Sequence, residues 1–323
     1  MSPTWLAVTD LPRRLAVTGA AGYIATRLIE ALTRGAKIDS VLAIDRRRPP
    51  TSDRGEVEYL RLDVGDPFPD LFVGRGIDTV VHLAYDLNPG HDRKAVWRVN
   101  VGGAVNLIDA CASAGVGHIL YLSSTSVYGA YPNNPEELSE ESPARPLQGF
   151  QYSEGKAEAE ALLGQYAADN PDCAVTVLRA CPVLGPNADN FIAAAFSKPL
   201  LVGVKGHDPP MQFLHEDDLV DCMLACLRHR PRGAYNLAGS GTVLWSEMAA
   251  LADRRMLKLP AAILYGLASL GWALRLQSDS PARGIDFIRY RWTVDSSKFE
   301  RELGLAPRHS SRQAWEAYVK REA

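Results

Sequence analysis

Residues 15–25 read LAVTGAAGYIA, a short apolar run that leads directly into a glycine-rich turn. This pattern predicts a buried strand, a tight turn at Gly19 and a helix that begins close to Tyr23. Glycine at position 22 lets the backbone approach a pyrophosphate, and the small Ala25 lets the helix pack against the strand. The start of such a helix offers unpaired N–H groups and a partial positive charge, so the stretch predicts a phosphate-binding turn.

An acidic residue follows this turn at the spacing of a dinucleotide site. Asp45 ends the next predicted strand, about 20 residues after Ala25. Its carboxylate would accept hydrogen bonds from the adenosine ribose and repel a 2′-phosphate, whereas the arginines at 46–48 would hold that phosphate. We therefore predict NAD as the cofactor, with NADP as the alternative. The contacts expected from these two segments are Gly19, Ala21, Gly22, Tyr23, Ile24, Asp45 and Arg46.

Strands and helices alternate along the first half of the chain. Runs typical of buried strands lie at 15–18, 41–45, 57–62, 79–83, 118–123 and 174–179. Helical patterns lie between or after them at 23–34, 92–114, 152–169 and 217–228. Such alternation indicates right-handed βαβ units, so the predicted fold class is α/β with a doubly wound parallel (Rossmann) sheet.

Past Arg179 the alternation loosens, and proline and glycine punctuate the chain. We predict an NAD(P)-binding Rossmann domain over residues 1–180, with returning segments near 211–240. Residues 181–210 and 241–323 are predicted to form a smaller, mixed C-terminal lobe that binds the substrate.

The composition excludes several classes of protein. A net charge of −3 gives no basic excess, so we expect no nucleic-acid partner. The five cysteines form no C-x-x-C pair, which favours reduced thiols in a cytoplasmic protein and no metal site. The chain opens without the charged and apolar pattern of a signal peptide.

One apolar segment requires a separate interpretation. Residues 259–274 read LPAAILYGLASLGWAL and are closed by Arg275. The segment is shorter than the roughly 20 residues that a membrane-spanning helix needs. We expect a packed or substrate-facing helix, with an interfacial contact as the alternative, and no stable membrane insertion.

Tyr152 and Lys156, in YSEGK at 152–156, lie one turn apart on the same face of a predicted helix. A free phenol has a pKa of about 10 and is a poor base at neutral pH. A neighbouring ammonium and a positive nicotinamide ring would favour the phenolate and lower that pKa. The pair predicts a tyrosine acid/base that moves a hydroxyl proton while hydride is transferred at the same carbon.

The stretch SSTSVYG at 123–129 follows a strand whose end should lie at the carboxyl edge of the sheet, where ligands bind. The hydroxyl of Ser124 can hold a substrate oxygen there. The alternative is a serine-rich turn that only caps backbone groups. Beside Tyr152 and Lys156, we favour a catalytic role for Ser124.

Together these motifs resemble the extended short-chain dehydrogenases of the epimerase/dehydratase type, and the resemblance covers nearly the whole chain. The motifs in matching order are TGAAGYIA at 18–25, Asp45, LDV at 62–64, VHLA at 81–84, VNV at 99–101, SSTSVYG at 123–129, YSEGK at 152–156, LRACPVLGP at 178–186, FLHEDDL at 213–219, YNLAGSG at 235–241 and VDSSKFERELG at 294–304. A series of this length and order is specific for the family.

The resemblance implies further contacts to the cofactor. They are Asp63 and Val64 at the adenine, Leu83, Ala84 and Tyr85 along the cofactor path, Asn100 behind the nicotinamide, Lys156 at its ribose, and also Ser123 and Pro182. The resemblance also implies a homodimer that forms a four-helix bundle from helices 92–114 and 152–169.

Two positions depart from the pattern of the nucleotide-sugar members. Pro182 stands where an asparagine is usual, and Met211 stands where an arginine is usual. A thioether in place of a guanidinium removes a phosphate contact and makes the pocket more apolar. We therefore expect a small, fairly apolar alcohol or ketone, such as a steroid or a polyketide-like molecule. Its expected contacts are Tyr85, Ser124, Ser126 and Met211.

The leading hypothesis is an NAD(P)-dependent oxidoreductase that acts at a secondary alcohol or ketone carbon. The first alternative is a nucleotide-sugar 4-epimerase or dehydratase with tightly bound, recycled NAD. The second is a non-catalytic protein that senses the cofactor and binds a partner. Such relatives typically lose the tyrosine or the lysine, so the intact YSEGK counts against it.

Overall fold

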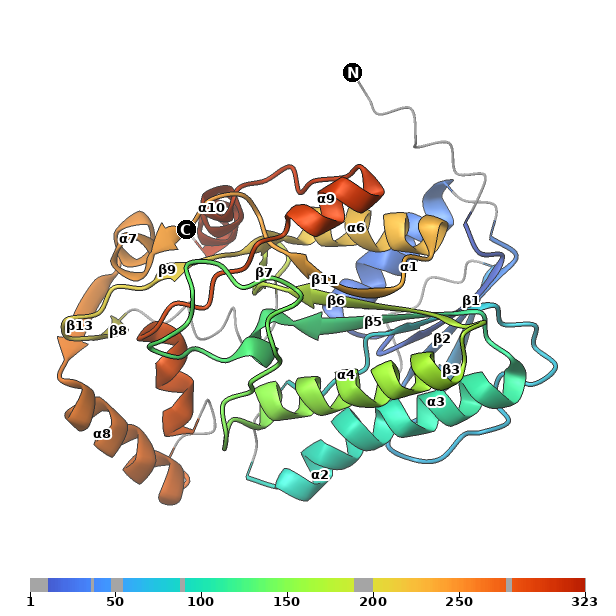
Figure 1. Cartoon of the computed structure of the whole chain (residues 1–323), viewed down its shortest axis with the longest axis horizontal. Helices are drawn as coiled ribbons and strands as arrows, with labels where there is room; N and C mark the ends of the chain where they lie inside the picture. The colour runs from blue at the N-terminus through green and yellow to red at the C-terminus, as the bar shows by residue number, and fades with distance from the viewer. Residues whose placement is uncertain are drawn as a thin grey trace.

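A parallel sheet occupies the centre of the molecule (Figure 1). The computed structural model describes residues 11–35, 38–47, 55–87, 91–188, 200–276 and 281–322. Within these residues the sheet has seven strands in the order β11-β6-β5-β4-β1-β2-β3, and every pair is parallel. The strands are β1 (Arg14–Thr18), β2 (Ser40–Asp45), β3 (Val57–Arg61), β4 (Thr79–His82), β5 (His118–Ser124), β6 (Ala174–Ala180) and β11 (Gly233–Leu237). The strand order reverses between β1 and β4, and the predicted doubly wound fold is confirmed.

Helices cover both faces of this sheet (Figure 1). Helices α1 (Tyr23–Gly35) and α6 (Glu216–His229) pack together on one face. Helices α3 (Gly103–Ala114) and α4 (Gln151–Asp169) pack together on the other. Each face buries its own apolar cluster, because strands that are covered on both sides alternate their side chains between the two layers.

The helix expected over residues 92–114 is divided into three parts. A short α2 (Arg93–Trp97) leads into a π-helical turn, η2 (Arg98–Gly102), and then into α3. Close packing explains why glycine follows this turn, since a Cβ on Gly103 would lie 2.8 Å from a methyl group of Val64. The sequence pattern did not reveal this wide turn because the apolar spacing is almost unchanged across it.

The described residues of the C-terminal half add short strands and helices beside the central sheet. Three two-stranded sheets pair β7 (Val183–Leu184) with β10 (Leu214–His215), β8 (Leu200–Val204) with β13 (Arg255–Leu259), and β9 (Pro210–Met211) with β12 (Val243–Leu244). The accompanying helices are α7 (Trp245–Leu251), α8 (Ala261–Ala273), η4 (Ala282–Ile288), α9 (Ser297–Leu303) and α10 (Ser311–Glu322). A separate aromatic-rich cluster that includes Trp245, Trp292 and Trp315 forms the core of these pieces.

The apolar segment 259–274 lies at the surface, contrary to the expectation of a packed or substrate-facing helix. Its helix α8 contacts η4 and projects from one end of the molecule (Figure 1). Leu264 is its buried residue, whereas the next leucines along the helix are more than half exposed. No helix in the described part of the chain is long and apolar enough to cross a membrane.

Candidate active site

A cleft of about 990 Å³ opens at the carboxyl ends of the central strands. One end of its wall is the turn between β1 and α1, and the other end is formed by the last residues of β5 and the first turns of α4. The point at which the strand order reverses is where ligands bind in open α/β sheets. The predicted cofactor residues Gly19, Ala21, Gly22, Tyr23, Ile24, Arg46, Leu83, Tyr85, Ser123, Tyr152, Lys156 and Pro182 all line this cleft, as does Ser124.

The turn after β1 has the geometry that its glycines predicted. Gly19 has a φ of +72°, and the N–H of Gly22 donates to its carbonyl over 2.8 Å. A Cβ on Gly19 would lie 2.6 Å from the backbone nitrogen of Ala84, a separation that real Cβ atoms do not reach. The turn can therefore pack directly on the backbone of Leu83 and Ala84 only because position 19 has no side chain, and its positive φ also requires glycine.

Asp45 is buried at the end of β2 and fixes the neighbouring loop. Its carboxylate accepts hydrogen bonds from the N–H groups of Ala21, over 3.0 Å, and Arg47, over 2.8 Å. The guanidinium of Arg47 lies 3.6 Å from the same carboxylate. Two backbone donors orient the carboxylate toward the glycine-rich turn, where an adenosine ribose would be bound. Arg48 lies outside the described residues.

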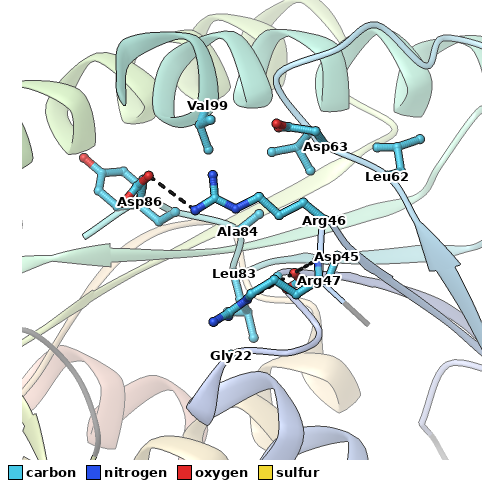
Figure 2. A pocket seen from close by; sticks show the side chains of 13 residues that line it. Gly22, Asp45, Arg46, Arg47, Leu62, Asp63, Leu83, Ala84, Asp86 and Val99 are labelled. Carbon is cyan, nitrogen blue, oxygen red and sulfur yellow. Dashed lines mark hydrogen bonds and ion pairs between the residues drawn. The ribbon is translucent and has the colours of Figure 1, made fainter. Parts of the chain in front are cut away.

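A smaller pocket of about 100 Å³ adjoins this end of the cleft (Figure 2). Its lining includes the predicted adenine contacts Asp63 and Val64. Arg46 extends across it, and its guanidinium lies 3.5 Å from the carboxylate of Asp86 (Figure 2). Because the Arg46 side chain is about half exposed, at 53 %, it can swing away from a ligand.

Tyr152 and Ser124 meet at the opposite end of the cleft. Ser124 is the last residue of β5, and Tyr152 lies in the first turn of α4. The Ser124 hydroxyl accepts a hydrogen bond from the N–H of Ser126 over 3.1 Å. Burial raises the pKa of Tyr152, and the neighbouring Ser124 hydroxyl opposes that rise. The lowering of this pKa that the sequence predicted is therefore not found.

The orientation of Lys156 explains this difference. Its ammonium donates to the carbonyl of Leu122 over 2.7 Å and lies 3.8 Å above the ring of Tyr85. Burial lowers the pKa of Lys156 to about 7, against the carboxylate of Glu160, which raises it. The ammonium of Lys156 is thus directed at the Leu122 carbonyl and the Tyr85 ring and not at the phenol of Tyr152.

Tyr85 contacts both Tyr152 and Lys156. Its hydroxyl donates to the carbonyl of Tyr152 over 2.9 Å, and the two rings meet edge to face at 5.4 Å. Gly155 makes this position possible, because a Cβ there would lie 2.7 Å from the Tyr85 hydroxyl. The glycine inside YSEGK therefore admits a close neighbour and is not simply a residue on the helix surface.

A buried ion pair that no sequence motif predicted lies next to the site. Arg179 on β6 contacts Glu160 on α4 over 2.7 Å and donates to the hydroxyl of Tyr128 over 2.7 Å. The hydroxyl of Ser123 also donates to Glu160, so this predicted cofactor contact is directed at the helix. The one available signal was spacing, since Glu160 lies one helical turn beyond Lys156.

Three of the predicted site residues do not line either of these two cavities. Asn100 is buried and clamps the backbone of Asp86, accepting from its N–H over 2.7 Å and donating to its carbonyl over 3.0 Å. Ser126 is buried, and its hydroxyl has no hydrogen-bond partner among the described residues. Met211 packs in the core of the C-terminal lobe against Trp245 and its neighbours, away from the wall of the cleft.

The family model that matches this chain is described as the NAD dependent epimerase/dehydratase family, and it covers residues 15–238. This match confirms the family that the motifs resemble. A dTDP-glucose 4,6-dehydratase of Streptomyces griseus is 28% identical and covers 91% of this chain and 89% of its own length. An Arabidopsis thaliana 3beta-hydroxysteroid-dehydrogenase/decarboxylase, isoform 1, is 24% identical and covers 93% of this chain and 77% of its own.

A solved structure with a similar fold is MoeE5 in complex with UDP-glucose and NAD. It is 26% identical, with a TM-score of 0.73, and the match covers 96% of this chain and 98% of MoeE5.

Proposed function

Because the chain belongs to the NAD dependent epimerase/dehydratase family, we propose that it transfers hydride between NAD and a secondary alcohol or ketone carbon of a small, fairly apolar substrate. The observation that carries this proposal is that Tyr152 and Ser124 line the same cleft as the glycine-rich turn. A proton donor and a dinucleotide cradle on one cleft wall are what a hydride transfer between carbon and nicotinamide requires.

Each residue of the site has a distinct role in this proposal. Ser124 holds the substrate oxygen, and Tyr152 exchanges a proton with that oxygen through its phenol. Bound NAD supplies the hydride acceptor, and its positive ring would counter the burial that raises the pKa of Tyr152. Lys156 lies one turn along α4 and would turn from the Leu122 carbonyl toward the ribose.

The charges along the cleft favour an uncharged substrate. Within the described residues, the basic side chains on its wall already contact a carboxylate or, in one instance, a backbone carbonyl. These contacts are Arg27 with Glu216, Arg46 with Asp86, Arg47 with Asp45, and Lys156 with the carbonyl of Leu122. A nucleotide sugar would bring a second pyrophosphate, which needs cationic donors of its own.

A second candidate function is supported by the relatives. The dehydratase of Streptomyces griseus is named for a nucleotide sugar, and MoeE5 was solved in complex with UDP-glucose. Both are at least as similar in sequence to this chain as the steroid enzyme. In a 4-epimerase or dehydratase the same Tyr152 and Ser124 would act, but NAD would be reduced and reoxidised within each turnover. We also propose that the protein is a cytoplasmic homodimer that pairs α3 and α4 with their copies.

The test is the identity and amount of nucleotide released when the purified protein is denatured. The dehydrogenase proposal predicts a site that binds added NAD⁺ reversibly and forms NADH, followed at 340 nm, with a hydroxysteroid or another apolar alcohol. Stoichiometric NAD⁺ retained through purification, together with turnover of dTDP- or UDP-glucose and no net NADH, would instead establish the second candidate.

A further inference from the structure

Helix α8 presents an apolar face to solvent. Ile263, Leu267, Leu270 and Leu274, which we call the α8 face, are 50%, 58%, 57% and 58% exposed. Their spacing of four, three and four residues places them in one stripe along the helix. Leu276, just past the end of α8, is 78% exposed. Contiguous apolar surface of this kind marks an interaction site, whereas single exposed leucines do not.

The exposed apolar residues are concentrated in this region. Half of the large hydrophobic side chains that are exposed in the described part of the chain lie between Ile263 and Leu276. Two more are Leu257 on β13, the strand that leads into α8, and Leu200 on β8, the strand that pairs with β13. The other three are scattered over the rest of the molecule.

Positive charge frames the α8 face at both ends. Arg255 and Lys258 lie on β13, before the helix begins, and Arg275 follows its last turn; all three are exposed. The sequence from 254 to 276 contains no aspartate or glutamate, although the whole chain has a net charge of −3. Two amphipathic aromatic residues, Tyr265 and Trp272, are also on the helix and are partly buried.

We propose that the α8 face docks on an anionic phospholipid surface, with the helix in the plane of the interface. Its 13 residues span about 20 Å, which suits a helix that rests on a bilayer and does not cross it. The apolar stripe would enter the boundary between headgroups and acyl chains, and the flanking basic residues would contact anionic headgroups. This inference does not depend on which reaction the cleft performs.

The charges favour this occupant over a second copy of the chain. In a twofold contact between two α8 faces, Lys258 of one copy would face either Lys258 or Arg275 of the second copy. Like charges would therefore meet in both arrangements. An anionic membrane would contact the apolar stripe together with Arg255 and Arg275, whereas Lys258 also lies 3.9 Å from the carboxylate of Asp208.

The docked helix would also lie beside the catalytic end of the cleft. Helix α8 packs on η4, in which Phe287 contacts Phe150 with ring centroids 5.3 Å apart. Phe150 in turn lies 6.3 Å from the ring of Tyr152. An aromatic path therefore connects the proposed membrane face with the catalytic tyrosine.

Flotation of the full-length protein with lipid vesicles tests the proposal. Vesicles of phosphatidylcholine alone are compared with vesicles that contain phosphatidylcholine and phosphatidylglycerol in similar amounts, at low and high salt. The test variant is Leu267→Gln/Leu270→Gln/Leu274→Gln. The matched control is Val73→Gln/Leu244→Gln, which alters side chains that are 52% and 44% exposed elsewhere.

We expect the wild type and the control to float with anionic vesicles and to be released by high salt. The triple variant should bind at least about tenfold less, and Arg275→Gln about fivefold less. Thermal unfolding checks that each variant is folded. Absence of flotation with anionic vesicles, or undiminished flotation of the triple variant, would overturn the proposal. A third result would also overturn it: the wild type forms a dimer and does not bind vesicles, and the triple variant is a monomer. The α8 face would then be the contact with a second copy.

Discussion

The two ends of the cleft are built by different means. At one end, which we propose binds the nucleotide, the wall is a backbone turn and the carboxylate of Asp45, which two nearby N–H groups orient. At the other, proposed catalytic end, Tyr152 and Lys156 come from α4 and Ser124 comes from β5, and Lys156 is buried against Tyr85 and near Glu160. The first end depends on local backbone conformation, and the second depends on the surroundings that distant segments create.

The surroundings created by distant segments determine how the groups at the catalytic end titrate. Burial raises the pKa of Tyr152 and lowers that of Lys156, so at the catalytic end burial disfavours the charged form of both groups.

The largest expected effect separates chemistry from cofactor binding. Tyr152→Phe should lower kcat by about 10²- to 10⁴-fold, because the proton donor is lost, and leave the Kd for NAD nearly unchanged. Steady-state kinetics and fluorescence titration with NADH measure the two quantities. Tyr166→Phe, near the other end of α4, is the control and should keep its activity. Turnover that persists in Tyr152→Phe would show that another group moves the proton.

The second largest effect is expected on cofactor binding. Gly19→Ala places a Cβ 2.6 Å from the Ala84 nitrogen at a φ of +72° and should weaken NAD binding by about tenfold or more. Gly74→Ala is a matched control, with a φ of +74° and nothing within 4 Å of the new Cβ. It carries the same backbone strain and should bind NAD normally by calorimetric titration. Equal losses in both variants would mean that backbone strain, and not crowding of the turn, weakens binding.

A smaller effect tests how Tyr85 supports the catalytic end. Gly155→Ala would push the Tyr85 hydroxyl from the Tyr152 carbonyl and should lower kcat by about three- to tenfold. Gly164→Ala on the same helix meets nothing within 4 Å, and it should stabilise the fold by about 0.5–1 kcal/mol without affecting kcat. Both quantities come from kinetics and denaturant unfolding. A Gly155→Ala enzyme with full activity would remove Tyr85 from the catalytic arrangement.

The smallest expected effect concerns stability and pH. The pKa of Lys156 falls from 10.5 to about 7 on folding, so the folded state carries an unfavourable buried ammonium in full below pH 7. This destabilisation fades between pH 7 and 10.5, where the folded state has lost the proton that the unfolded chain still keeps. Lys156→Met should therefore raise the Tm at pH 6, by about 2–4 °C for each kcal/mol recovered, and the gain should shrink toward pH 10.

The exposed Lys94 supplies the control for this comparison. Lys94→Met should leave the Tm unchanged at both pH values. A gain in Lys156→Met that is the same at pH 6 and pH 10 would assign the effect to packing of the methionine and not to the charge.

Most of the fold followed from local sequence patterns. The six predicted strands and helices α1, α4 and α6 agree with the structure to within a residue or two at each end. Their β-branched runs and helical spacing are local properties that burial on both faces of a sheet reinforces. The exception within the first half was the π-helical turn η2, where packing of Gly103 on Val64 changes the backbone without changing the apolar pattern.

The candidate site was predicted less completely. The motifs identified which residues gather at the cleft, but Met211 is in a core and Asn100 clamps a loop. Glu160 and Arg179 form a buried ion pair that no single sequence motif predicted. Side-chain direction in these positions depends on which distant element offers a partner, and a linear pattern does not contain that information.

The sequence by itself determined the Rossmann sheet, the glycine-rich turn and the one-turn spacing of Tyr152 and Lys156, because backbone conformation and helical periodicity are set by neighbours along the chain. The tertiary structure alone decided that Lys156 turns toward Leu122, that Tyr85 fits against Gly155 and that the leucines of α8 remain exposed. Each of these depends on burial, and the burial of a side chain is the sum of what remote segments bring around it.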